Sequence, residues 1–142
     1  IEDNVSLELL KRLVWDMRRW MAERGQRDKP LIISEYGVLM PSEYLGKTEA
    51  EGDQVVQEFM LGSFDFFRET RDAEVGYPQD ENRLVQRWLW YSLNEVPYQY
   101  DEDAETWVGF NGALFDWTTR AWPGQLTPLG EAFAAYTSAL PE

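Results

Sequence analysis

Apolar residues recur along the first part of the chain at the spacing of an α-helix. Steps of three and four residues place them on one face between about Val5 and Arg24. The members of this stripe are Leu10, Leu13, Val14, Met17, Trp20 and Met21. Asn4 or Ser6 can cap the start of the helix, and Gly25 can end it in a left-handed turn. The pattern predicts an amphipathic helix with one apolar side.

A short apolar run follows the polar turn after this helix. Leu31, Ile32 and Ile33 show no polar alternation, which predicts a strand that is buried on both faces. Glu35 stands where this strand is expected to end, and Gly37 releases the backbone into a turn. An acid at the C-terminal end of a buried parallel strand occupies the position that carries the chemistry of an α/β barrel. Glu35 is therefore the first candidate catalytic residue.

The rest of the chain predicts two more helices and one more strand. The second helix is expected at 53–70 and the second strand at 86–93, ending before Asn94. Thr127 as N-cap and Pro128 at the first helical position begin the last helix. The order helix, strand, helix, strand, helix makes the two strands parallel neighbours with a right-handed crossover. Two parallel strands cannot hide both faces and both edges, so a larger sheet is expected around them.

Composition and charge narrow the chemistry of this 142-residue chain, whose length fits one domain. The 26 acidic and 13 basic residues give a net charge of −13, which argues against a nucleic-acid or anionic-membrane partner. A neutral substrate such as a sugar fits this charge better. The sequence has neither cysteine nor histidine, which removes thiol nucleophiles, Ser-His-Asp catalysis and the commonest zinc ligand. Acid–base chemistry must then use carboxylates, Tyr or Lys, and no cofactor or metal is expected.

The second strand is crowded with aromatic residues. Trp88 and Trp90 share a face because alternate residues of a strand point the same way, and at least one of them is expected in the core. The other can serve as a platform for the apolar face of a sugar, and Trp90 is the candidate because it lies nearer the C-terminal end. Tyr36 can donate a hydrogen bond to Glu35 or can pack in the core. Further candidates for ligand contact after the second strand are Asn94, Asn111, Asp116, Trp117 and Trp122.

An acidic stretch at 101–105 lacks the glycine and the closing glutamate of a calcium loop, which favours a solvated loop.

Three segments resemble one enzyme family. Lys29-Pro30-Leu31-Ile32-Ile33-Ser34-Glu35-Tyr36-Gly37 resembles the seventh-strand nucleophile segment of retaining glycoside hydrolases with (β/α)8 barrels, the clan of cellulases, mannanases and xylosidases. Trp88-Leu89-Trp90-Tyr91-Ser92-Leu93-Asn94 resembles the eighth strand, where an aromatic side chain often floors the sugar subsite. Leu114-Phe115-Asp116, followed by the segment from Gln125 to Phe133, resembles the closing loop and helix. The resemblance implies an α/β fold in which residues 1–142 are the C-terminal part of a TIM (β/α)8 barrel.

The resemblance also implies a function. It implies double-displacement hydrolysis of a carbohydrate, with Glu35 as the nucleophile and with Trp90, Tyr36 and Asn94 in contact with the sugar. A bacterial enzyme at the cell surface or outside the cell is implied as well. In this family the acid–base glutamate follows an Asn at the end of the fourth strand, a segment that this chain does not contain. Because the chain begins with Ile1, we expect a missing N-terminal barrel segment as its partner. Because the acid–base glutamate would lie in that segment, we expect no turnover by the chain alone.

Two other functions stay open beside the hydrolase. The first is a non-catalytic carbohydrate-binding relative that keeps the aromatic cleft. The second is an acidic scaffold or interaction domain in which Glu35 is a structural or merely solvated carboxylate. Exposed strand edges further predict that the isolated chain aggregates or forms oligomers.

Overall fold

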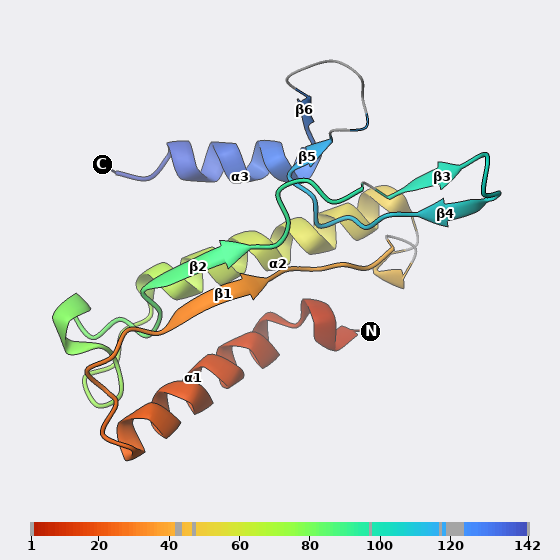
Figure 1. Ribbon diagram of the computed structural model, residues 1–142. Helices are drawn as coiled ribbons and strands as arrows, with labels where there is room; N and C mark the ends of the chain where they lie inside the picture. Colours follow the sequence, from red (N-terminus) through yellow and green to blue (C-terminus); the bar gives the residue numbers. More distant parts are fainter. Residues whose placement is uncertain are drawn as a thin grey trace. The chain divides into compact units, whose positions relative to one another are not determined.

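The computed structural model describes residues 2–41, 44–46, 48–96, 98–116, 118 and 124–141. Its α-helices are α1 (Leu7–Glu23), α2 (Glu49–Glu69) and α3 (Pro128–Ser138) (Figure 1). Its strands are β1 (Ile32–Tyr36), β2 (Arg87–Trp90), β3 (Gln99–Asp101), β4 (Thr106–Val108), β5 (Phe115–Asp116) and β6 (Gln125–Leu126). Two short 3-10 helices, Glu2–Val5 and Pro78–Asp80, complete the regular structure of this part of the chain.

The described strands form three separate sheets of two strands each. β1 and β2 are parallel neighbours, whereas β3 pairs with β4 and β5 pairs with β6 in antiparallel fashion (Figure 1). The predicted α/β fold, a partial TIM (β/α)8 barrel over residues 1–142, is therefore wrong, because a barrel wall is one continuous parallel sheet. Strands of two or three residues are too short to show a period of two, so the sequence pattern does not predict β3 to β6 as strands.

The chain divides into two compact units, which are described separately. The helix–strand unit comprises residues 6–36 and 62–89, and the hairpin unit comprises residues 1–5, 37–61 and 90–142. Helix α2 contributes its first part to the hairpin unit and its last part to the helix–strand unit.

The helix–strand unit is built on a small apolar core. Val14 of α1, Phe67 of α2, Leu84 and Val85 are buried together. Trp88 of β2 packs against this cluster, with its ring centroid 5.3 Å from that of Phe67. The prediction that one tryptophan of this strand lies in the core is confirmed for Trp88.

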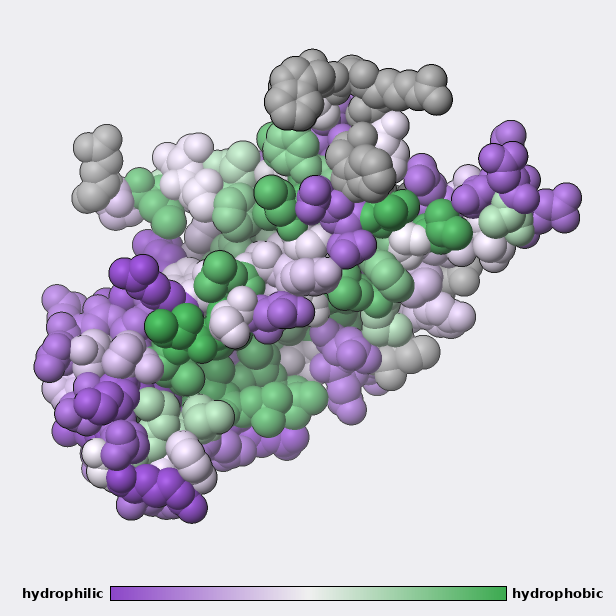
Figure 2. Space-filling model, in the orientation of Figure 1, coloured by the Kyte–Doolittle hydropathy of each residue, from purple (hydrophilic) through white to green (hydrophobic). Residues whose placement is uncertain are grey.

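The opposite side of the parallel strand pair is exposed. Ile32 of β1 is 50% exposed and Leu89 of β2 is 56% exposed, and Figure 2 shows an apolar area over these strands. Ile33, in contrast, packs against the core cluster. The expected burial of β1 on both faces is therefore wrong within the described chain, where the packed face is the one that meets the core cluster.

Helix α1 forms where the apolar stripe predicts it, and Ser6 rather than Asn4 caps it. The Ser6 hydroxyl accepts a hydrogen bond from the Leu9 N–H at 3.2 Å. The buried positions, however, are Val14, Arg18 and Met21. Three members of the predicted stripe are 45–56% exposed, namely Leu13, Met17 and Trp20. The helix is thus rotated away from the orientation that its hydrophobicity alone favours.

The buried Arg18 accounts for this rotation. Its Nε and Nη2 donate to the Val75 carbonyl at 2.9 and 2.6 Å. Its Nη1 donates to the Lys29 carbonyl and its Nη2 to the Arg27 carbonyl, each at 3.0 Å. Burial, and to a smaller extent the charge of Arg27, lower the pKa of the Arg18 guanidinium. A single side chain therefore fastens α1 to two separate loops.

In the hairpin unit, α2 begins at Glu49, earlier than the predicted start at residue 53, because a capping box precedes it. The Glu51 N–H donates to Thr48 Oγ1 at 3.2 Å, and the Thr48 N–H donates back to Glu51 Oε2 at 3.0 Å. At the other end of this unit, α3 begins at Pro128 as predicted. Thr127 Oγ1 accepts from the Gly130 N–H at 3.0 Å and donates to the Ala113 carbonyl at 2.6 Å.

Candidate functional site

Glu35, the proposed nucleophile, lies within one residue of the end of β1, where the sequence predicts it. The strand continues to Tyr36, so the carboxylate is one residue before the strand end. Its side chain is exposed, and within the described part of the chain it takes part in no hydrogen bond or ion pair. The carboxylate is therefore available to a ligand without the loss of an existing contact.

Tyr36 fixes the backbone next to this carboxylate. Its hydroxyl shares a hydrogen bond of 2.9 Å with Ser63 Oγ on α2. Its ring meets Phe67 edge-on at 5.4 Å between centroids, with an interplanar angle of 76°. Of the two roles left open for Tyr36, these contacts favour packing. They hold the end of β1 on α2 while the neighbouring carboxylate stays in solvent.

Trp90 and Asn94 belong to the hairpin unit. The Trp90 indole N–H donates to the Gly112 carbonyl at 2.9 Å, and its ring centroid lies 6.4 Å from that of Phe59. Trp90 is half-buried, which leaves part of its ring open to solvent. Asn94 is exposed in a bend after β2. Of the four predicted site residues, the structure brings Glu35 and Tyr36 together as neighbours on one strand.

Glu95, in the loop after β2, is held by two hydrogen bonds. The Tyr91 hydroxyl donates to Glu95 Oε1 at 2.8 Å, and the Glu95 N–H donates to Ser92 Oγ at 3.0 Å. Asp116, another candidate, accepts two hydrogen bonds from Thr118, from its N–H at 2.8 Å and its hydroxyl at 2.6 Å. The remaining loop candidates, Trp117 and Trp122, lie outside the described residues.

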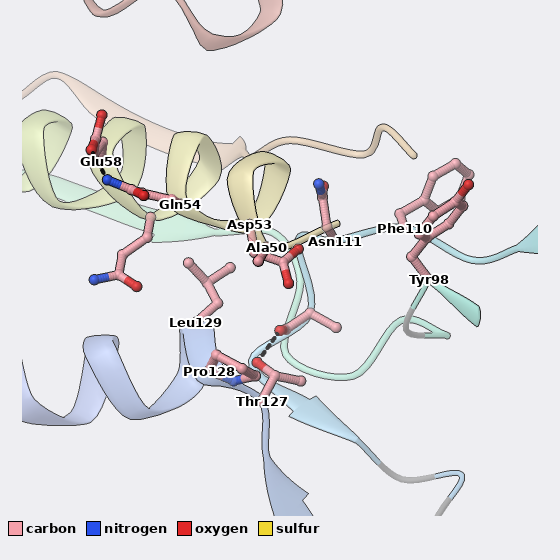
Figure 3. Close-up of a pocket in the computed structure, with 12 residues that line it drawn as sticks. Ala50, Asp53, Gln54, Glu58, Tyr98, Phe110, Asn111, Thr127, Pro128 and Leu129 are labelled. Atoms are coloured by element: carbon pink, nitrogen blue, oxygen red, sulfur yellow. Dashed lines mark hydrogen bonds between the residues drawn. The ribbon is translucent and has the colours of Figure 1, made fainter. Parts of the chain in front are cut away.

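A cavity of about 590 Å³ lies in the hairpin unit (Figure 3). Four segments build it. The first turns of α2 provide a polar wall of Asp53, Gln54, Gln57 and Glu58, beside Ala50. Tyr98 precedes β3 and Phe110 follows β4, so the base of this hairpin provides an aromatic wall. The remaining lining residues are Asn111, Ala113, Thr127, Pro128 and Leu129.

The part of the lining that the structure describes is amphipathic and contains no basic side chain. Gln54 Nε2 donates to Glu58 Oε1 at 2.8 Å, so one carboxylate of the wall already has a partner (Figure 3). Of the lining residues, sequence reasoning named only Asn111 as a ligand candidate. The cavity forms from segments that are dozens of residues apart, and no local motif marks such a site.

Three further findings bear on function. The described residues contain no group of three or more acidic side chains arranged to hold a metal ion. Among the helices described, none is both long and apolar enough to cross a membrane. Comparison with protein-family models, with curated proteins and with solved structures gives no match.

Proposed function

We propose that this chain acts on carbohydrates and that Glu35 is the nucleophile of a retaining glycoside hydrolase. The observation that carries the proposal is the state of this carboxylate: it is exposed and without a partner in the described chain, on a strand end that Tyr36 anchors to α2. A nucleophile needs an accessible oxygen, and its approach to the sugar is favoured when the backbone behind it is fixed. The family resemblance of the segment around Glu35 supports the same role.

The proposed reaction is a double displacement. A Glu35 carboxylate oxygen attacks the anomeric carbon, the bond from that carbon to the leaving oxygen breaks, and a glycosyl ester forms. Water then attacks the same carbon and gives a proton to a base, while the bond from that carbon to the Glu35 oxygen breaks. The Glu35 carboxylate is restored and the sugar is released with its original anomeric configuration. A second carboxylic acid must protonate a poor leaving group in the first step.

Covalent labelling tests the first step by itself. The chain is incubated with 2,4-dinitrophenyl 2-deoxy-2-fluoro glycosides of glucose, mannose and xylose, and intact mass and peptide mapping follow. Dinitrophenolate departs without protonation, so the test does not depend on a general acid. Fluorine at carbon 2 slows hydrolysis of the ester, so the labelled chain accumulates. We expect a mass increase of one fluoroglycosyl residue on the peptide that contains Glu35.

Two variants make this test specific. Glu35→Gln should take no label, whereas Glu69→Gln, which changes an exposed carboxylate of the same unit, should label like the unchanged chain. Absence of label with all three sugars, or label on the chain that persists in Glu35→Gln, would show that Glu35 is not the nucleophile.

A further inference from the structure

The cavity of the hairpin unit combines features that together define a ligand class. Its volume of about 590 Å³ falls within the range of about 300–1,000 Å³ that is typical of small-molecule sites. Its lining has aromatic rings at one end and polar side chains of α2 at the other (Figure 3). From this arrangement we infer that the cavity is a binding site for a neutral saccharide of one or two rings.

The charge of the described lining disfavours an anionic ligand. Among the described residues, the lining has the carboxylates of Asp53 and Glu58 and no Lys or Arg, in a chain whose net charge is −13. A phosphate or a uronate would meet repulsion without a compensating donor. The same carboxylates would attract a cationic ligand, and the cationic probe below tests that alternative. A neutral ligand with many hydroxyl groups can form hydrogen bonds with both the amide and the carboxylate groups of this wall.

Two side chains are available for direct contact with such a ligand. Phe110 is 37% exposed and stacks on no other ring within the described chain. Its face can cover the apolar C–H side of a pyranose ring. Gln57 is half-buried, and its side chain makes no hydrogen bond within that same part of the chain. Its amide offers both a donor and an acceptor, which is what a hydroxyl group needs.

The walls of the cavity are fixed before a ligand arrives. Thr127 Oγ1 ties the start of α3 to the Ala113 carbonyl at 2.6 Å, and both residues line the cavity. The capping box of Thr48 and Glu51 sets the first turn of α2, next to Ala50 and Asp53. A pre-formed site loses less conformational entropy on binding, which favours affinity.

The choice of a saccharide over other neutral polar ligands rests on the proposed function, whereas the location of the site does not. Titration calorimetry and saturation-transfer NMR test both with cellobiose, mannobiose and xylobiose as neutral probes. Digalacturonate serves as the anionic probe and a dimer of glucosamine as the cationic probe. We expect at least one neutral disaccharide to bind and both charged probes to bind at least tenfold more weakly.

Variants locate the binding. Phe110→Ala and Gln57→Leu should each weaken binding of the neutral probe about tenfold, the loss of one good contact. Tyr44→Ala removes an aromatic side chain of the same unit that is 55% exposed and lies outside the cavity, and it should change nothing. Circular dichroism shows whether each cavity variant is folded. If one of the two variants misfolds, the other still tests the inference.

The binding results test the cavity inference independently of the role of Glu35. Failure of every neutral disaccharide to bind, preference for a charged probe, or unchanged affinity in both folded cavity variants overturns it. Glu35→Gln should leave the affinity unchanged, because Glu35 does not line the cavity. Binding at the cavity without covalent labelling of Glu35 would refute the proposed function alone, and labelling without cavity binding would refute this inference alone.

Discussion

The hydroxyl groups of Tyr36 and Ser63 lie 2.9 Å apart, and this hydrogen bond joins the end of β1 to the buried side of α2. Tyr36→Phe removes the bond and keeps the edge contact with Phe67, so the free energy of unfolding should fall by about 1 kcal/mol. Urea denaturation measures the change. Ser63→Ala tests the same bond from the other side. The double variant should cost less than the sum of the two single variants, and strict additivity would show that the hydroxyl groups act independently.

Arg18 should be the most sensitive position of α1. Arg18→Met keeps most of the side-chain volume but leaves the carbonyl groups of Arg27, Lys29 and Val75 without their donor. We expect a loss of about 3–5 kcal/mol in the free energy of unfolding, measured in urea. Arg19→Met is the matched control, because Arg19 is exposed and pairs with Asp16 on the surface. The control should change stability by less than about 0.5 kcal/mol, and equal losses in the two variants would contradict the role of Arg18.

Glu35→Gln should leave the stability of the chain unchanged to within about 0.5 kcal/mol. The carboxylate is exposed and has no partner in the described chain, so the amide removes no folded-state contact. Thermal unfolding of both forms in the same buffer measures the difference. A loss of more than about 1 kcal/mol would favour a structural role for Glu35 and weaken the hydrolase proposal.

Thr127 joins the cap of α3 to the wall of the cavity. Thr127→Val has nearly the same shape but loses both the cap of the Gly130 N–H and the bond to the Ala113 carbonyl. It should lower the free energy of unfolding by about 1–2 kcal/mol. Thr127→Ser keeps the hydroxyl and should lose less than half of that amount. If the serine variant is as unstable as the valine variant, the methyl group rather than the hydroxyl stabilises this end of α3.

The parts of the fold that sequence predicted are those whose causes are local. Ser6 and Thr127 cap the helices that follow them because a side-chain oxygen reaches an N–H three residues on, whatever surrounds it. Thr48 and Glu51 carry the same kind of signal as a capping box, and reading it would have placed the start of α2 correctly.

The parts that sequence did not predict depend on contacts between distant segments. Nothing near Arg18 indicates that the Val75 carbonyl, 57 positions away, will accept its hydrogen bonds. The β3–β4 hairpin has three paired positions and an acidic turn without an Asn-Gly signal. Its sequence pattern therefore predicts a loop. The same distinction applies to the candidate site. The residues next to Glu35 are enough to predict it as a candidate, whereas the cavity forms only when α2, the β3–β4 hairpin and α3 come together.

The burial of Arg18 among carbonyl groups affects how the attachment of α1 responds to ionic strength. Carbonyl oxygens carry no net charge and condense no counterions, so added salt has little to compete for at this junction. The exposed ion pairs of α1, such as Lys11 with Glu8, are screened as salt rises. In molar sodium chloride α1 should therefore lose the small contribution of its surface pairs and stay fastened to its two loops.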